Sequence, residues 1–221
     1  MDHDTTRKKL AHYRIVKDME NKKLDVLLGT QMVAKGHDFP GVTLSAVVFA
    51  DIALNLPDFR TSERAFQLFT QLAGRAGRGE TAGKVYIQTY EPHHYIFDYV
   101  KNHDYQGFYE KEIEFRKELF YPPFGRLLRI VFSFRNKEGA AKIMKNVSGK
   151  IKNLKSGEGR VEILGPAPAP VEKIRNLWRW HLILKGGASK SLRQKALEIL
   201  TAVKDIKDMK TDIDVDPVNL M

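Results

Sequence analysis

The sequence predicts an α/β protein in two parts: a layer of parallel strands and helices, followed by a smaller sheet of the ferredoxin-like α+β type. Short apolar runs alternate with amphipathic stretches over residues 1–91, an order typical of a doubly wound parallel sheet. After Gly125 the order is strand, helix, strand, strand, helix, strand, which is the ferredoxin-like arrangement. Residues 92–120 lie between the two parts as a helical connector, so the expected domains are 1–91, 92–120 and 121–221.

The spacing of apolar residues predicts each helix and strand of the first part. Apolar residues recur three or four positions apart in two stretches, which predicts amphipathic helices over residues 10–19 and 61–73. Unbroken apolar runs are typical of strands buried in a parallel sheet, and they predict strands at 24–30, 42–51 and 84–89. Ligands bind such sheets at the carboxyl ends of the strands, so we expect functional residues directly after these runs.

Two prolines mark where the last domain begins. The connector carries an apolar stripe between charged residues up to Glu118, and Pro122 and Pro123 follow Tyr121. A proline cannot continue a helix and disfavours helical backbone at the residue before it. We therefore place the start of the last domain at Tyr121.

The last domain follows from the same two periods. Strands are expected at 126–134, 161–164, 177–184 and 211–217, and helices over 140–154 and 192–206. Gly165 to Pro170 (GPAPAP) is expected to form a stiff extended linker. In the third strand Trp178 and Trp180 share one face, so we expect both in the core rather than as base-stacking platforms. Both helices would then cover one face of the sheet.

The excess of positive charge lies in the last domain. The formal net charge is +10, and residues 119–221 contain 20 Lys and Arg against 10 Asp and Glu. A basic domain beside a near-neutral one indicates a polyanion partner; the alternative is lysine enrichment that only increases solubility. The candidate contacts for such a partner surround the third strand and the helix after it: Lys173, Arg175, Arg179, Lys185, Lys190, Arg193 and Lys195.

Composition excludes several classes of protein. The sequence has no cysteine, and therefore neither a disulfide framework nor a thiolate zinc site. Its seven histidines show no ligand spacing beyond the pair His93 and His94, which is expected in a solvated turn after Pro92, so no metal site is expected. No apolar stretch approaches the roughly 20 residues that span a bilayer, and the charged N-terminus is unlike a signal peptide. We expect a cytoplasmic protein with no membrane partner.

The first motif is GTQMVAKGHDFP, residues 29–40, at the end of the strand expected over 24–30. Thr30 and nearby amides can donate hydrogen bonds to a phosphate, and the glycines permit close approach of the backbone. Asp38 can accept a hydrogen bond from a ribose hydroxyl or from a partner domain. Taken alone, the string also fits a strand-to-helix turn with a glycine cap.

The second motif is QLAGRAGRG, residues 71–79, at the end of a helix. Arg75 and Arg78 are three positions apart and therefore project from one face. A guanidinium binds phosphate oxygens bidentately and stays charged. The two side chains are therefore candidate arginine fingers, which stabilise charge on a transferred phosphoryl group. For an isolated GRxGR string, the alternative is a helix end with solvated arginines.

Together the two strings resemble motifs V and VI of superfamily-2 helicases, and the chain as a whole resembles the family of replication-restart helicases (PriA, primosomal protein N′). The resemblance is carried by GTQMVAKGHDFPGVTL, ALNLPDFRTSERAFQLFTQLAGRAGR and DIDVDP. It implies a partial RecA-like second helicase lobe followed by a domain that contributes to DNA binding. The implied activity is ATP-dependent 3′→5′ DNA unwinding in replication restart and primosome assembly. The implied partners are forked or single-stranded DNA, single-stranded DNA-binding protein and primosomal proteins.

The resemblance also implies roles for individual residues. Those expected near the DNA strand are Thr30, Gln31 and Lys35. Those expected to face the nucleotide are Gly36 and Asp38. Those expected at its phosphates, as catalytic residues, are Gln71, Arg75 and Arg78.

The chain departs from the family where ATP would bind. It contains neither a GxxxxGK[ST] phosphate-binding loop nor a DExH-type string for magnesium, and the family's zinc-binding cysteines are missing. ATP and Mg²⁺ would be held by a lobe upstream, so we expect that this chain alone does not hydrolyse ATP. The alternative is a stand-alone module, without enzymatic activity, that binds nucleic acid or primosomal proteins. DNA binding would weaken steeply with salt, whereas protein binding would not.

Overall fold

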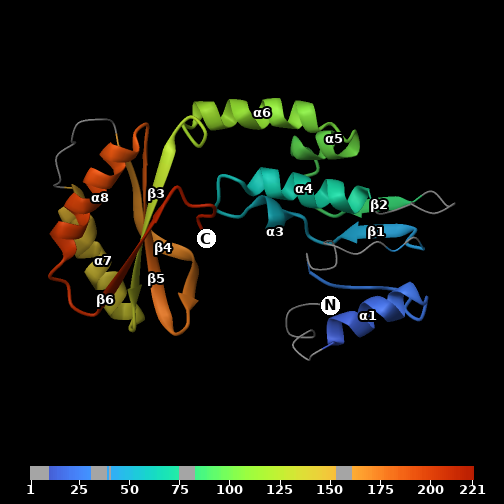
Figure 1. The fold of residues 1–221 in the computed structure, drawn as a ribbon, viewed down its shortest axis with the longest axis horizontal. Coiled ribbons are helices and arrows are strands. Elements are labelled where there is room, and N and C mark those ends of the chain that lie inside the picture. The colour runs from blue at the N-terminus through green and yellow to red at the C-terminus, as the bar shows by residue number, and fades with distance from the viewer. Residues whose placement is uncertain (1–9, 31–38, 40, 75–82, 153–160) are drawn as a thin grey trace. The chain divides into compact units, whose positions relative to one another are not determined.

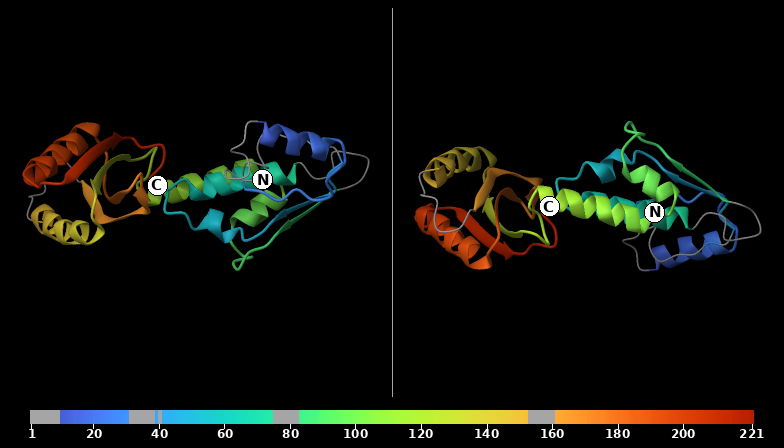
Figure 2. Two further views of the ribbon diagram at one scale, coloured as in Figure 1. Left: turned by 90° about the horizontal axis from the view of Figure 1, so that it is seen from below. Right: turned by 90° about the horizontal axis from the view of Figure 1, so that it is seen from above.

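Figures 1 and 2 show the computed structural model of the chain, which describes residues 10–30, 39, 41–74, 83–152 and 161–221. The chain forms two compact units: residues 1–56 with 60–109, and residues 57–59 with 110–221. The helix α6 (Tyr105–Glu118) contains the division at residue 109. Each unit has a hydrophobic core of its own.

The first unit contains a two-stranded sheet and helices. β1 (Leu44–Val47) and β2 (Lys84–Ile87) pair in parallel, as predicted, although both are shorter than the strands expected from sequence. The expected helices at 10–19 and 61–73 are confirmed. Within the part of this unit that the structure describes, the helices are α1 (Ala11–Glu20), α3 (Asp51–Leu54), α4 (Thr61–Ala73), α5 (Ile96–Lys101) and the first turns of α6.

Aromatic side chains form the core of the first unit because α4 repeats large apolar residues on one face. Phe66 and Phe69 of α4 belong to one buried cluster with Ile96 of α5 and Phe108 of α6, each at most 4% exposed. The rings of Phe66 and Phe108 stack with their centroids 4.2 Å apart. Burying a side chain of this size stabilises a fold by about 1.5–3 kcal/mol, so these contacts hold the helices together.

The prediction of a strand over residues 24–30 is wrong. The segment is described as irregular backbone, and the side chains of Val26 and Leu28 are 80% and 77% exposed. A continuous apolar run becomes a buried strand only when neighbouring strands take its backbone hydrogen bonds. Within the described residues β1 and β2 pair only with each other, so this run has no strand beside it.

Among the described residues, the second unit contains the last turns of α6, a four-stranded antiparallel sheet and two helices that connect its strands. Its strands β3 (Arg126–Phe134), β4 (Glu162–Ile174), β5 (Leu177–Gly186) and β6 (Met209–Val215) lie in the order β4-β5-β3-β6. α7 (Lys137–Lys152) follows β3, and α8 (Ser189–Val203) follows β5. This order is the predicted ferredoxin-like arrangement. Both helices cover the same face of the sheet (Figures 1 and 2), also as predicted.

Strand alternation explains the core beneath these helices. Every second residue of β3 points to the helical face, which buries Leu128, Ile130 and Phe132. Leu182 and Leu184 do the same from β5. The helices contribute Met144, Val147 and Ile151 from α7 and Leu192, Ala196, Ile199 and Val203 from α8.

The prediction of a stiff linker at residues 165–170 is wrong, because these residues lie inside β4. β4 is an edge strand with register shifts between Leu164 and Ala167 and between Pro168 and Lys173. Proline donates no backbone hydrogen bond and is tolerated at an edge or a bulge. Gly165 has φ 101°, and a Cβ there would lie 2.9 Å from the carbonyl oxygen of His181. A proline-rich string therefore remains compatible with a strand that has one open side.

No helix among the described residues is long and apolar enough to cross a membrane. The described residues also contain no group of three or more histidine and acidic side chains that could hold a metal ion.

Candidate nucleic-acid interface

The helicase-like motifs lie mostly outside the described residues. Gln71 is exposed on the last turn of α4, which ends at Ala73 with Gly74 as its C-cap. Thr30 is exposed at the end of the irregular segment after α1. The other predicted motif residues lie outside the described residues, and their roles stay predictions: Gln31, Lys35, Gly36, Asp38, Arg75 and Arg78.

A buried carboxylate joins the ends of the two parallel strands in the first unit. Asp51, 7% exposed, is the first residue of α3 and follows β1 closely. Its Oδ1 accepts hydrogen bonds from the Thr89 hydroxyl (3.0 Å) and from the Tyr90 backbone N–H (3.1 Å), both just beyond β2. Sequence reasoning missed this residue, although an aspartate directly after an apolar run was an available signal. It stabilises the edge at which parallel sheets bind ligands.

The second unit divides the basic residues predicted to bind DNA between two ends of its sheet. Trp178 of β5 lies opposite Phe134 of β3 and Lys173 of β4, so the ends of β3 and β4 meet the start of β5. We call this the basic end, and it consists of Arg135, Lys137, Lys173, Arg175 and Arg179. Arg135 and Lys137 were not singled out from sequence, because they lie about forty residues before the others.

A tight hairpin turn presents part of the basic end. Ile174 pairs with Leu177, so the turn between β4 and β5 consists of Arg175 and Asn176 alone. Both have positive φ, 49° and 63°, as in the type I′ turn whose twist matches a hairpin. Arg175 is exposed at this turn, together with Lys173 two residues before it.

Trp178 occupies the basic end and contacts two of its lysines. The Nζ atoms of Lys137 and Lys173 lie 4.6 Å and 5.2 Å from its ring centroid, within cation–π range. Glu172 approaches Lys137 with an N–O distance of 3.4 Å. Trp180, two residues later on the same face, packs against the core as expected. The two tryptophans, which the sequence treats alike, therefore have different surroundings.

Arg179 is half-buried on the face of the sheet away from the helices. Burial lowers the pKa of its guanidinium, the nearby charge of Arg129 lowers it further, and Asp212 opposes both. A guanidinium remains charged near neutral pH despite such shifts. Its positive charge is therefore available to an anion at this end.

The other predicted contacts lie at the opposite end of β5. Lys185 is seven residues from Trp178 along the strand, roughly 23 Å at 3.3 Å per residue. Lys190 and Arg193 are exposed on the first turns of α8. Lys195 is 5% exposed and pairs with Glu198 at 2.5 Å. The seven candidates therefore form no single surface.

The side chain of Lys185 is buried and makes contacts that stabilise the fold. It is 8% exposed, and its Nζ donates to the carbonyl oxygen of Leu119 (2.8 Å) and pairs with Glu162 (2.8 Å). The Tyr121 ring lies 4.9 Å away. These contacts join β5 to the segment that follows α6, so DNA contact by this ammonium stays a prediction without support from its geometry.

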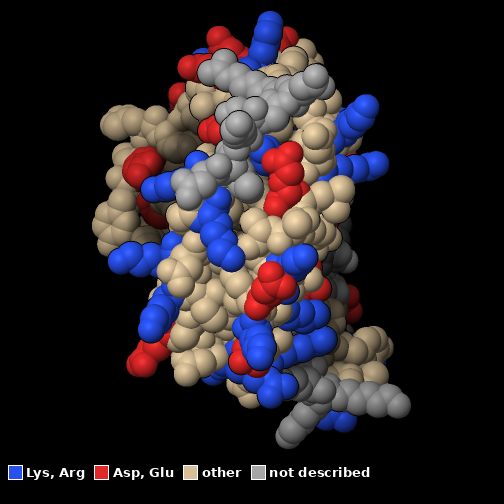
Figure 3. All heavy atoms as spheres, turned by 90° about the vertical axis from the view of Figure 1, so that its left-hand side faces the viewer, with Lys and Arg blue, Asp and Glu red and all other residues tan. Residues whose placement is uncertain are grey.

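Figure 3 shows the side of the chain that carries α7 and α8, with Lys and Arg in blue. Basic side chains gather on the lower part of this side, and acidic side chains are interspersed among them (Figure 3). The surface is therefore mixed in charge with a local basic excess, rather than uniformly positive.

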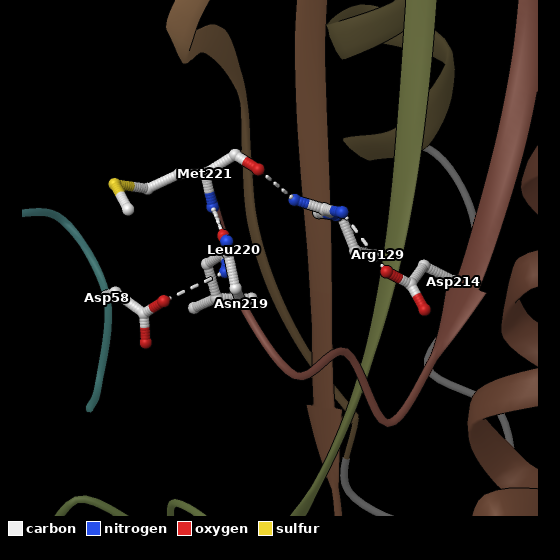
Figure 4. A network of polar contacts seen from close by, with 6 residues as sticks. All are labelled: Asp58, Arg129, Asp214, Asn219, Leu220 and Met221. Atoms are coloured by element: carbon white, nitrogen blue, oxygen red, sulfur yellow. Dashed lines mark hydrogen bonds and ion pairs between the residues drawn. The ribbon is translucent and has the colours of Figure 1, made fainter. Parts of the chain in front are cut away.

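The end of the chain covers part of the other sheet face. Arg129 donates to the backbone oxygen of Met221 (2.9 Å) and pairs with Asp214 (3.1 Å), as Figure 4 shows. Asp58 accepts a hydrogen bond from the Leu220 backbone N–H (3.1 Å). These contacts hold residues 219–221 against the second unit.

Two family models match the chain. Residues 2–80 match the helicase conserved C-terminal domain, and residues 117–218 match the primosomal protein N C-terminal domain. Among solved structures, the de novo designed protein Foldit4 aligns with 42% of this chain and 97% of its own, with 13% identity and a TM-score of 0.31. A similarity of that size supports no functional conclusion.

Curated relatives match over the full chain. Replication restart protein PriA of Bacillus subtilis is 39% identical over 100% of this chain and 28% of its own length. The PriA proteins of Synechocystis sp. and Borreliella burgdorferi are 40% and 34% identical over 99% and 100% of this chain. The chain spans 26–33% of the length of these three relatives. It therefore belongs to the PriA family of replication restart proteins, and corresponds to the C-terminal part of such a protein.

Proposed function

We propose that this chain is the C-terminal part of an ATP-dependent 3′→5′ DNA helicase that acts in replication restart and primosome assembly. In this proposal the first unit supplies Gln71, Arg75 and Arg78 to ATP and Mg²⁺ held by another lobe, and the second unit contacts DNA. The partners are forked or single-stranded DNA, single-stranded DNA-binding protein and primosomal proteins, in the cytoplasm. Family membership and the helicase conserved C-terminal domain support the motor role.

The basic end is the observation that supports DNA contact. Five basic residues lie at one end of the sheet, and four of them are exposed. Each Lys or Arg that neutralises a phosphate releases a counterion, so affinity falls with salt by a slope of about 0.7 per phosphate for single strands and about 0.9 for duplex. Contact with three to five phosphates therefore predicts a slope of about 2 to 4.5 in log affinity against log salt.

The test compares the two ends of β5. Binding of labelled forked and single-stranded DNA is followed by fluorescence anisotropy at several salt concentrations. The double variant Lys173→Ala with Arg175→Ala should weaken binding and lower the salt slope by about 1 to 2. The matched variant Lys190→Ala with Arg193→Ala removes the same charge from the opposite end and should change both quantities less.

Three other outcomes would change the proposal. If Lys190→Ala with Arg193→Ala has the larger effect, the interface lies on α8. If the chain binds neither forked nor single-stranded DNA at low salt, the charge excess serves solubility. A role in docking primosomal proteins then becomes the better-supported hypothesis. Detectable ATP hydrolysis by the chain alone would contradict the proposal that another lobe holds the nucleotide.

A further inference from the structure

We infer that Trp178 is a stacking platform for an unpaired nucleobase, so that the basic end recognises single-stranded nucleic acid rather than duplex. The inference rests on the proposed function, because it requires that the basic end contacts nucleic acid. It goes beyond charge, since it assigns the recognition of bases to one side chain.

The first step is the position of the indole. Trp178 is the second residue of β5, next to the turn formed by Arg175 and Asn176. It is half-buried, and Phe134, its partner on β3, is 2% exposed. Part of the ring therefore remains accessible beside the hairpin turn.

The second step is what covers the accessible part. Lys173 lies directly opposite Trp178 in the antiparallel pair, and Lys137 begins α7. Both ammonium groups lie over the indole, and the Lys137 side chain is 64% exposed. These are flexible side chains at the surface, so the indole is covered by groups that can move away without repacking the core.

The third step is an exchange of partners. A cation–π contact at an exposed site is weak, whereas an ammonium on a phosphate makes a charge-assisted hydrogen bond. A phosphodiester strand at the basic end would therefore draw Lys137 and Lys173 from the ring. Lys137 would also leave Glu172, its partner at 3.4 Å. The freed indole face can then stack with a base, which contributes about 5- to 150-fold in affinity.

The fourth step is the choice of strand. Bases of a duplex are stacked inside it and show only their edges in the grooves. An aromatic face within a basic surface is the combination that binds unpaired bases in a sequence-tolerant way. The basic end of this unit has both components: the ammonium groups of Lys137 and Lys173 lie at the indole, and Arg175 is exposed at the turn three residues before Trp178.

The experiment uses the two tryptophans of the 221-residue chain as matched reporters. Trp180→Phe leaves Trp178 as the sole tryptophan, and Trp178→Phe leaves Trp180, which packs against the core. Each is titrated with a thymidine oligonucleotide of about 12 nucleotides, within the usual site size, and with an abasic oligonucleotide of equal length. Emission from Trp178 should fall with the thymidine strand only, and emission from Trp180 should not respond.

Affinity provides a second readout. Trp178→Leu should weaken binding of the thymidine strand by about 5- to 150-fold and leave the abasic strand within about twofold, whereas Trp178→Tyr should recover part of the loss. Glu172→Gln should strengthen the binding of both oligonucleotides, because it removes a carboxylate that competes with phosphate for Lys137. Thermal unfolding shows whether each variant is folded.

The outcomes separate this inference from the proposed function. Base stacking is overturned, while DNA binding stands, if both oligonucleotides bind with equal affinity and Trp178 emission is unchanged. The same conclusion follows if Trp178→Leu weakens the binding of both oligonucleotides equally. If neither strand binds at low salt, the proposed function fails and takes the inference with it.

Discussion

The carboxylate of Asp58 accepts a 3.1 Å hydrogen bond from the backbone N–H of Leu220, a residue 162 positions later in the sequence. Both residues are buried, at 9% and 4% exposure. The segment 57–59 belongs to the second unit although the residues on both sides of it belong to the first. This hydrogen bond therefore joins an early part of the chain to the end of the chain within one compact unit (Figure 4).

Replacing Asp58 should destabilise the second unit. In Asp58→Ala the buried N–H of Leu220 loses its acceptor, which costs about 1–3 kcal/mol. Asp58→Asn retains a carbonyl oxygen and should lose less. Urea unfolding followed by circular dichroism measures the difference. Equal stability of Asp58→Ala and the wild type would show that this hydrogen bond contributes nothing to the stability of the fold.

Stability should depend on pH through His181. Burial lowers its pKa below the ordinary 6.5, the charges of Arg129 and Arg179 lower it further, and a backbone hydrogen bond with Leu220 opposes them. Within the described residues its buried Nδ1 has no hydrogen-bond partner, so a proton there lacks an acceptor. The unfolded chain takes up the proton first, and stability present above pH 6.5 is lost as pH falls toward the lowered pKa.

The measurement is the unfolding free energy between about pH 5 and pH 8. His181→Gln should flatten the fall on the acid side, because glutamine does not titrate in this range. His94, whose pKa is lowered mainly by burial with Glu91 opposing, lies in the first unit. His94→Gln serves as the control that separates the two histidines, and an unchanged acid profile in His181→Gln would contradict the assignment.

Lys185 should matter for stability more than for DNA binding. Lys185→Met keeps most of the side-chain volume but removes the ammonium from the Leu119 oxygen and from Glu162. Glu162 is 53% exposed and can be hydrated, so we expect a loss of about 1–3 kcal/mol, mainly from the carbonyl oxygen. The exposed Lys190→Met should stay within about 0.5 kcal/mol. A loss of DNA affinity in Lys185→Met without a loss of stability would instead indicate that Lys185 contacts DNA.

Asp51 should hold together the strand ends of the first unit. Asp51→Ala removes the acceptor for the Thr89 hydroxyl and the Tyr90 N–H, which should cost about 1–3 kcal/mol in thermal or urea unfolding. Thr89→Val removes only one of the two donors and should cost less. If the two variants are equally stable, the Tyr90 N–H is satisfied by another group.

Much of the fold follows from local pattern. The helix predicted over 61–73 has the same bounds as α4, and the strand predicted over 126–134 has the same bounds as β3. These elements depend on contacts within one face, which the spacing of apolar residues records directly. Residues 24–30 and 165–170 were predicted wrongly because their state depends on which strands lie beside them, and spacing carries no record of neighbours.

The candidate interface was predictable only in part. The excess of charge in residues 119–221 indicated a basic domain, yet it did not separate Lys173 from Lys185. Those two lysines are twelve positions apart in the sequence, and the hairpin places one at the turn and the other at the far end of β5. Arg135 and Lys137 come to Lys173 from much farther along the chain, through the pairing of β3 with β5.

The sequence by itself determined the family, the order of the elements and the domain that carries the charge, because motifs and periodicity are properties of neighbouring residues. Only the tertiary structure decided which basic residues share a surface, why Trp178 differs from Trp180, and how Asp58 reaches Leu220. Antiparallel pairing is the physical reason: it brings distant residues together at one end of a sheet and moves near ones roughly 20 Å apart.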